Sequence, residues 1–336
     1  MLSGKYRILR VGNFYTNDSW YYSDLELGEK YYANYGDLLY TWSATFGPHI
    51  WLGDRVIYHY HIWKISLSDM LEKQFTVQLL EQHKSNILAG KNGSTMVHIT
   101  KEGMEQKDVI IPQSIKEQQQ IGAFFNQLDE LITLHQRKLD KLINVKKSML
   151  EKMFPKQGST VPEIRFTGFT NDWEQRKLNE FTKYSSSSLT VKDIDETASY
   201  DLYDANEEIG KTDKSPLFDD YISIIKDGAG VGRVRKLPKN TSVLGTMGAI
   251  IPQNSDYNFL FSILEKTDFT KLTSGGTIPH IYYNQYGKKV YSIPTLEEQQ
   301  KIGQYFRNLD NLITLHQCEL EKLQNIKKSM LEKMFV

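Results

Sequence analysis

The chain has 336 residues, of which 40% are hydrophobic and 24% are charged, and its 41 basic side chains equal its 41 acidic ones. This composition excludes a wholly disordered chain, the apolar runs are too short to span a membrane, and the length suggests two domains or a duplicated unit. The one cysteine, Cys318, excludes an intrachain disulfide, so we expect a cytoplasmic protein without a membrane partner.

Residues 1–112 are expected to form a globular domain with a β core. Residues 56–65 are rich in β-branched and aromatic side chains, as strands are, and residues 76–88 have the composition of a short helix. His59 and His61 would share one face of that strand, but no other residue has the spacing of a zinc ligand. We therefore expect no metal site.

Residues 41–47 of this domain combine a tryptophan with small hydroxyl side chains. Such hydroxyls suit hydrogen bonds to phosphates or base edges, so one interpretation is a surface that faces nucleic acid. A buried tryptophan flanked by surface threonine and serine is an equally good interpretation of the same residues.

Residues 113–154 are expected to form one long helix. Ser114 and Glu117 have the spacing of a capping box, and the rest of the segment contains no proline. Apolar side chains recur at steps of four and three residues over four heptads, which predicts a coiled coil. Two polar residues, at 135 and 146, interrupt this seam and either reach out to water or fix the register. The seam positions that we predict are Leu128, Ile132, His135, Leu139 and Leu142.

An internal repeat organises the whole chain. Residues 121–154 align with residues 302–335 at a constant offset of 181 residues, with 24 identities in 34 positions. The repeat predicts a second long helix over residues 295–336. Residues 155–161 are polar and are expected to form a hinge between the two units. The seam positions of the second helix are Leu309, Ile313, His316, Leu320 and Leu323.

Residues 162–294 are expected to form a second globular domain, again with a β core. Residues 162–178 have no counterpart in the first domain, which is shorter by at least 21 residues. Weak similarity still links the two domains, because the motif Gly-[Ser/Gly]-Thr-x-x-His-Ile begins at position 93 and again at position 275. Similar helices that follow diverged domains suggest one scaffold that carries two domains with different recognition surfaces.

A glycine-rich stretch, residues 226–232, follows a predicted strand in the second domain. A nucleotide cofactor would need a helix after these glycines, and Pro238 interrupts the segment that follows instead. A turn between strands is the simplest interpretation. A loop that faces nucleic acid is the other, since five basic residues and one acidic residue lie between Lys226 and Lys239.

Taken together, these segments resemble the specificity subunit of type I restriction–modification systems. The resemblance rests on the twice-repeated helix, on the motif that precedes each helix, and on residues 162–178, which are similar to the usual start of a target-recognition domain. It covers nearly the whole chain. It implies a mixed α+β fold, with two target-recognition domains that are separated by two long helices in an antiparallel coiled coil.

The resemblance also implies a function. Each domain would read one half of a bipartite site on double-stranded DNA, and the helices would set the gap between the halves. Methylation subunits and restriction/translocase subunits would be the partners, and they would use S-adenosylmethionine, ATP and Mg. The chain itself would be non-catalytic and hold no cofactor, consistent with its lack of a phosphate-binding loop and of an Asn-Pro-Pro-aromatic segment.

Two other functions compete with this one. A coiled-coil adaptor would bind only proteins, and a stand-alone methyltransferase would bind S-adenosylmethionine by itself. If the resemblance holds, the residues that contact DNA have hydroxyl, aromatic or basic side chains, or lie in the glycine loop. In the first domain we expect Thr41, Trp42, Ser43, Thr45, Ser94, Thr95 and His98, and in the second Lys226, Gly230, Arg233, Arg235, Lys236, Thr277 and His280.

Overall fold

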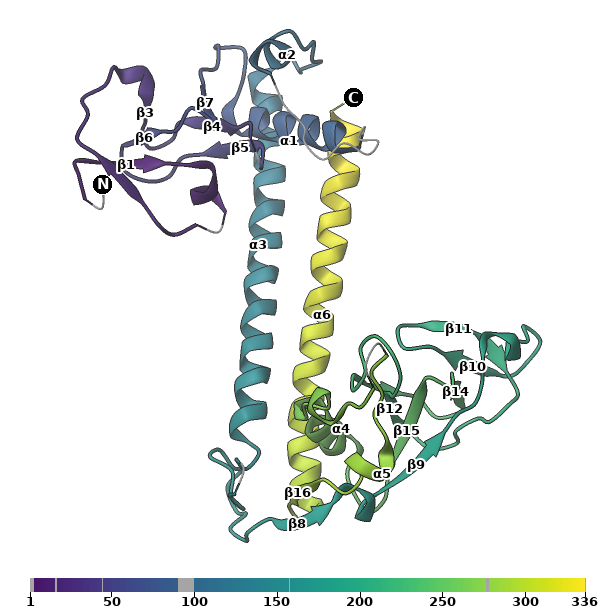
Figure 1. Cartoon of the computed structure of the whole chain (residues 1–336). Helices are drawn as coiled ribbons and strands as arrows, with labels where there is room; N and C mark the ends of the chain where they lie inside the picture. The colour runs from purple at the N-terminus through teal and green to yellow at the C-terminus, as the bar shows by residue number, and fades with distance from the viewer. Residues whose placement is uncertain are drawn as a thin grey trace. The chain divides into compact units, whose positions relative to one another are not determined.

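The structure is a computed structural model that describes residues 3–15, 17–43, 45–89, 100–156, 158–275 and 278–335. The chain divides into two compact units. The first comprises residues 1–136 and 318–336, and the second comprises residues 137–317. Each unit holds one globular domain and a part of both long helices (Figure 1).

Among its described residues, the globular part of the first unit contains two small sheets. One has the strand order β2-β1-β6-β3 and the other has the order β5-β4-β7; β1 and β6 run parallel and the other pairs are antiparallel. The strands are β1 (Tyr6–Leu9), β2 (Tyr21–Ser23), β3 (Tyr32–Ala33), β4 (Leu38–Thr41), β5 (Gly47–Ile50), β6 (Val56–Tyr58) and β7 (Ile62–Ile65), with short 3-10 turns η1 (Val11–Phe14) and η2 (Glu29–Tyr31).

The single strand predicted over residues 56–65 is wrong, because the segment folds back into β6 and β7. The backbone N–H of Ile62 donates to the carbonyl of His59 at 2.9 Å, which closes a turn. His59 and His61 therefore lie in a turn instead of on one strand face, with ring centroids 4.8 Å apart.

Helix α1 (Lys73–Ala89) begins three residues before the predicted start, and α2 (Lys101–Glu105) follows it. The carboxylate of Glu72 accepts the backbone N–H of Phe75 at 2.7 Å and so caps α1. The start of α1 lies against the long helix α3 (Ile115–Lys152) at Gly122. A Cβ atom at Gly122 would come within 2.7 Å of the Phe75 nitrogen, so this contact requires glycine.

The second unit repeats this plan, with two more strands than the first among the described residues. Its sheets have the orders β13-β12-β15-β9, β11-β10-β14 and β16-β8. The strands are β8 (Glu174–Lys177), β9 (Thr182–Ser186), β10 (Tyr200–Tyr203), β11 (Glu208–Thr212), β12 (Tyr221–Ile225), β13 (Val234–Leu237), β14 (Thr241–Val243), β15 (Met247–Pro252) and β16 (Val290–Ile293). The short helices are η3 (Leu178–Glu180), η4 (Val191–Asp193), α4 (Tyr257–Lys266), η5 (Thr270–Leu272) and α5 (Tyr283–Tyr286).

Helix α4 meets the second long helix, α6 (Leu296–Met334), as α1 meets α3. Asp256 caps α4 by accepting the backbone N–H of Phe259 at 2.8 Å. A Cβ atom at Gly303, the repeat of Gly122, would lie 2.8 Å from the Phe259 nitrogen. The duplicated glycine is therefore where each domain anchors to its helix.

The two long helices run antiparallel within each unit. In the first unit the ring of Phe125 on α3 lies 5.9 Å from that of Phe335, the residue that follows α6, and Asp129 pairs with Lys327. In the second unit the repeats of those phenylalanines, Phe306 and Phe154, are also 5.9 Å apart. All ten predicted seam positions are buried or half-buried, as a helix–helix seam requires.

Candidate nucleic-acid interface

The glycine-rich residues 226–232 form a turn between β12 and β13 in the second unit. The N–H of Gly232 donates to the carbonyl of Ile225 at 2.8 Å, and Gly228, Gly230 and Gly232 all have φ between 80° and 87°. Such φ values favour glycine, which explains why glycine occupies these three positions. A strand follows the turn, so the helix N-terminus that a nucleotide phosphate would need is missing here.

Arg233, at the end of this turn, and Arg235, in β13, both donate hydrogen bonds to a second turn, which joins β10 and β11. Arg233 Nη2 donates to the carbonyl of Ala205 at 2.5 Å and to Asn206 Oδ1 at 2.7 Å. Arg235 Nη1 donates to the carbonyl of Asn206 at 2.8 Å. Asp204 completes this turn by accepting the backbone N–H of Asn206 at 2.7 Å. The two turns therefore form one surface, which we call the arginine latch: Asp204, Ala205, Asn206, Arg233 and Arg235.

The latch fixes which way the amide of Asn206 faces. A guanidinium group only donates, so the atom beside Arg233 must be the amide oxygen. The exposed Nδ2 group then has no hydrogen-bond partner among the residues described. The arginine latch therefore presents the Asn206 Nδ2 group to solvent as a hydrogen-bond donor. Groups that only accept hydrogen bonds, such as guanine N7 and O6 or phosphate oxygens, would complement this donor. The sequence analysis missed Asn206, although Asp204 and Asn206 are typical turn residues.

Three other predicted residues of the second unit lie in or beside the glycine turn of residues 226–232. Lys226 Nζ donates to Ser186 Oγ at 3.1 Å, and His280 Nδ1 lies 2.7 Å from Asp227 Oδ1. Gly230 is in the turn itself. Thr277 lies outside the described residues.

Lys236 points toward the long helix α6 instead of the turn. Its Nζ atom lies 3.5 Å from Asp310 Oδ2, donates to Asn258 Oδ1 at 3.0 Å, and lies 4.5 Å from the centroid of the Phe261 ring. Burial lowers the pKa of Lys236, although Asp310 opposes that effect. Lys236 thus has a structural role, and the structure gives no support to its predicted contact with DNA.

The predicted residues of the first unit cluster at the hairpin of β4 and β5. Thr41 is fully buried and its hydroxyl donates to the carbonyl of Gly47 at 3.3 Å, so Thr41 is not placed to contact DNA. Trp42 and Ser43 are half-buried, and Thr45 is exposed. The indole of Trp42 donates to the carbonyl of Tyr60 at 3.0 Å. Ser94, Thr95 and His98 lie outside the described residues.

His49, which the sequence analysis did not single out, belongs to β5 of this hairpin. Its ring stacks on Phe14 with centroids 4.0 Å apart, and its Nε2 atom lies 3.1 Å from the hydroxyl of Tyr15. Burial lowers the pKa of His49 to about 4, and Lys84 adds to the effect. His49 is therefore neutral at neutral pH and belongs to the packing of the domain.

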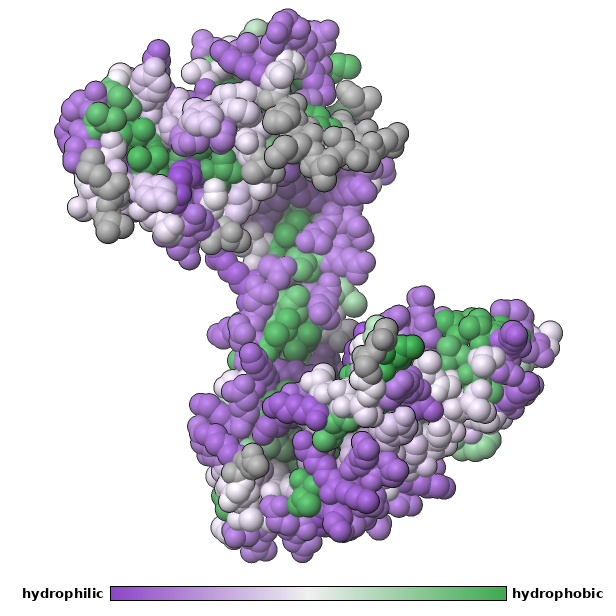
Figure 2. Space-filling model, in the orientation of Figure 1, coloured by the Kyte–Doolittle hydropathy of each residue, from purple (hydrophilic) through white to green (hydrophobic). Residues whose placement is uncertain are grey.

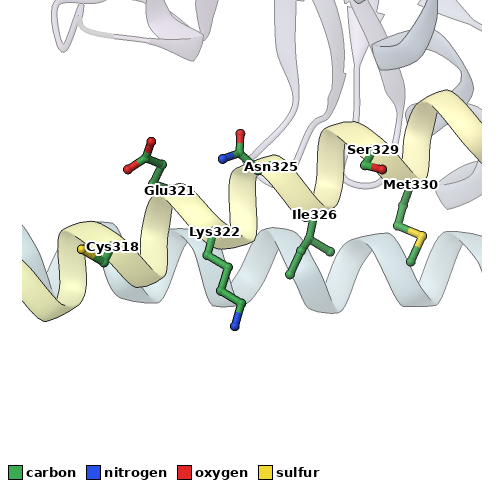
Figure 3. A pocket seen from close by; sticks show the side chains of 7 residues that line it. All are labelled: Cys318, Glu321, Lys322, Asn325, Ile326, Ser329 and Met330. Atoms are coloured by element: carbon green, nitrogen blue, oxygen red, sulfur yellow. The ribbon is translucent and has the colours of Figure 1, made fainter. Parts of the chain in front are cut away.

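A shallow cavity of about 540 Å³ lies along α6 in the first unit (Figure 3). All of the residues that line it come from this one helix, so it does not enclose a small molecule. They are Cys318, Glu321, Lys322, Asn325, Ile326, Ser329 and Met330.

Comparison with known proteins identifies the family. The model of the type I restriction modification DNA specificity domain matches residues 2–144 and 170–325. The chain belongs to this family. The match covers both units, so the resemblance found in the sequence is confirmed, as is the mixed α+β fold with two target-recognition domains.

Similar proteins and solved structures are also specificity subunits of type I systems. The MjaVIII type I restriction enzyme specificity subunit of Methanocaldococcus jannaschii is 23% identical over 332 residues, which cover 89% of this chain and 78% of the relative. The crystal structure of the type I restriction–modification S subunit from M. genitalium has the same fold, with a TM-score of 0.69 and 17% identity over all of this chain and 90% of its own. A chain from a study of type I complex assembly aligns with a TM-score of 0.52 and 15% identity, over 90% of this chain and 82% of that one. No described helix has the length and apolarity of a membrane span.

Proposed function

We propose that this chain is the DNA-recognition subunit of a type I restriction–modification complex. It reads a bipartite site on double-stranded DNA and directs adenine methylation and restriction by partner subunits. One observation carries the proposal: both units build the same pair of sheets on the same helix anchor, yet present different loops. The sheet β5-β4-β7 matches β13-β12-β15, whereas the hairpin tip of one unit carries Trp42 and small polar residues and that of the other carries three glycines and Arg233. Different loops on one scaffold suit the reading of two different half-sites.

The long helices serve in this proposal as the spacer between half-sites. Lys146 pairs with Asp310 at 2.7 Å in the second unit, and their repeats Lys327 and Asp129 pair in the first. Two equivalent ion pairs at fixed positions along the helices support a defined register between them.

We infer that two methylation subunits bind the exposed apolar side chains that the repeat places on both helices. In the first unit Leu131 and Leu134 on α3 are both 46% exposed. Their repeats on α6 in the second unit, Leu312 and Leu315, are 44% and 51% exposed. Figure 2 shows hydrophobic residues at the surface of the long helices. Identical exposed leucines in identical sequence fit two copies of one partner.

The chemistry belongs to the partners in this proposal. S-adenosylmethionine serves the methylation subunits, and ATP and Mg serve the restriction/translocase subunits. The chain is then a non-catalytic protein of the cytoplasm, where its DNA substrate lies. This assignment agrees with the glycine turn, which leads into a strand instead of a helix.

Long-read sequencing that detects methylated adenine tests the proposal. We compare a host with and without this gene, in the presence of the methylation subunit. The proposal predicts one bipartite methylated motif that disappears with the gene and returns on complementation. Unchanged methylation would favour the rival function, a coiled-coil adaptor that binds only proteins.

A further inference from the structure

The turn between β6 and β7 in the first unit, residues 59–61, has a counterpart in the second unit. In both units the residue after the turn donates its N–H to the carbonyl of the first residue of the turn, at 2.9 Å. Each turn also follows a strand that pairs in parallel with its neighbour, β6 with β1 and β14 with β10. Residues 59–61 therefore occupy the place of residues 244–246.

One backbone hydrogen bond joins each turn to the strand beside it. The N–H of His59 donates to the carbonyl of Leu9 at 2.9 Å. The N–H of Leu244 donates in the same way to the carbonyl of Tyr203 at 3.0 Å. In the second unit the next residue belongs to the arginine latch, whereas in the first unit it is a basic residue, Arg10. The turn of the first unit thus lies beside the counterpart of the latch.

A second hydrogen bond joins each turn to the hairpin beside it. The carbonyl of His61 accepts the N–H of Trp42 at 3.2 Å. The carbonyl of Thr246 accepts the N–H of Lys226, the first residue of the glycine-rich turn, at 3.0 Å. Residues 59–61 are therefore held between the counterparts of the two turns that form the arginine latch.

The two turns differ in what they expose. In the second unit Gly245 donates its N–H to the carbonyl of Leu189 at 2.7 Å, and a Cβ atom at this glycine would lie 3.1 Å from that oxygen. The backbone at Leu189 thus covers the turn. In the first unit the equivalent residue is Tyr60, which is 70% exposed. The first unit therefore presents an aromatic hydroxyl where the second unit has a covered glycine.

Ring contacts hold Tyr60 in this position. Its ring centroid lies 4.2 Å from that of His59 and 4.1 Å from that of His61. Trp42 supports the turn from the hairpin, because its indole N–H donates to the Tyr60 carbonyl and its ring packs edge-on against His61 at 5.0 Å. A side chain that is already held in place loses little conformational entropy on binding.

His59 provides a second donor beside the hydroxyl of Tyr60. Burial lowers the pKa of His59, and His61 and Arg10 add to this effect, so the ring is neutral at neutral pH. Its Nδ1 atom accepts the backbone N–H of His61 at 3.4 Å, and a neutral imidazole has one donor and one acceptor, so the proton is on Nε2. Neither this Nε2 atom nor the Tyr60 hydroxyl has a hydrogen-bond partner among the described residues.

We propose that His59 and Tyr60 bind a phosphate of the DNA backbone at the first half-site, an inference that rests on the proposed function. Phosphate oxygens only accept hydrogen bonds, and tyrosine hydroxyls and N–H groups are among the donors that bind them. The positive charge of Arg10, which acts on His59, favours a phosphate over an uncharged base edge. The contact positions the first domain on the duplex and carries no sequence information of its own.

Fluorescence anisotropy of the complex with the methylation subunits, on a labelled duplex that carries the methylated motif, tests the proposal. The double variant with His59→Phe and Tyr60→Phe removes both donors and keeps both rings, so we expect about tenfold weaker binding and an unchanged melting temperature. If the melting temperature falls, Tyr60→Phe alone carries the test, with an expected loss of about threefold. The control, Tyr35→Phe, removes the hydroxyl of a tyrosine that is 75% exposed near the opposite end of β4 and should bind as the wild type does.

A second duplex, in which the first half-site is scrambled, separates a phosphate contact from a base contact. The double variant should lose the same factor of affinity on both duplexes, since every sequence has phosphates. A loss confined to the motif would show a base contact, and equal binding by variant and wild type would show no contact, so either result overturns the proposal. A wild-type complex without preference for the motif would instead contradict the proposed function.

Neutral methylphosphonate linkages, placed one at a time along the first half-site, identify the phosphate. One linkage should weaken wild-type binding by about the same factor as the double variant does, and should have no further effect on that variant. If no linkage behaves in this way, the proposal is wrong.

Discussion

Lys146 on α3 and Asp310 on α6 form an ion pair at 2.7 Å in which the lysine side chain is only 15% exposed. Burial alone would lower the pKa of Lys146, but its hydrogen bonds to Asp310 and Glu265 outweigh burial and raise the pKa. The repeat places Lys327 and Asp129 in the same relation in the first unit. Of the two sequence interpretations of position 146, the structure favours a residue that fixes the register.

The first prediction concerns this pair. Asp310→Asn leaves Lys146 and Lys236 near each other without their shared carboxylate, so we expect the free energy of unfolding to fall by about 1–3 kcal/mol. Urea denaturation measures it. Lys147→Ala changes an exposed lysine on the next position and is the control. Equal effects of the two variants would contradict a structural role for the pair.

Acid sensitivity of the first unit should depend on His49. Its pKa of about 4 in the folded state lies below the ordinary value of 6.5, so the unfolded state binds the proton more tightly. The contribution of His49 is therefore complete above pH 6.5 and is lost as the pH falls toward 4, up to about 3 kcal/mol at 1.4 kcal/mol per pKa unit. We expect His49→Gln to lose less stability than the wild type between pH 7.5 and 4.5. If the free energies of unfolding of the wild type and of His49→Gln fall equally with pH, His49 has no such role.

The arginine latch should affect one half-site only. Arg233→Ala releases the turn that carries Asn206, so we expect methylation to lose preference at one half of the bipartite motif, with a rate at least about tenfold lower. Lys239→Ala, an exposed basic neighbour, is the control and should behave as the wild type. Equal loss at both half-sites would count against a local reader at this position.

The helices should act as a ruler. Deleting residues 136–142 and 317–323, one heptad from each helix, keeps the seam and both lysine–aspartate pairs. Seven residues span about 10 Å of helix, which corresponds to about three base pairs. The gap in the methylated motif should shorten accordingly. An unchanged gap, read from the methylome, would refute the spacer role.

The exposed leucines should each affect one partner. Leu131→Glu or Leu312→Glu should remove one methylation subunit from the complex, and the double variant should remove both. Native mass spectrometry gives the stoichiometry. Gln127→Glu, which adds a charge at an exposed position of α3, is the control. A full complex with the double variant would place the partners elsewhere.

The long helices could be predicted from the sequence because their signals are local. The capping box and the heptads predict the bounds of α3 almost to the residue, and the repeat does the same for α6. The repeat shows that Gly122 and Gly303 are equivalent, but the sequence does not show why both positions need glycine. Only the structure brings the start of α1 to Gly122 and the start of α4 to Gly303.

The candidate site was less predictable because its contacts join residues that are distant in sequence. Arg233 and Arg235 were predicted from local charge, yet their partner Asn206 lies 27 residues from Arg233. Lys236 shares that local charge but faces the opposite way, since successive side chains of a strand alternate. The fold of residues 56–65 was mispredicted for a similar reason: strand-forming residues do not reveal a turn that lacks glycine, proline or asparagine.

Domain exchange tests the central claim, two independent readers on one scaffold, most directly. Residues 162–294 are replaced by the matching domain of another specificity subunit of the family, and the methylated motif is read by long-read sequencing. The account predicts that one half of the motif changes, while the other half and the gap stay as they were. A motif in which both halves change together, or neither changes, would contradict it.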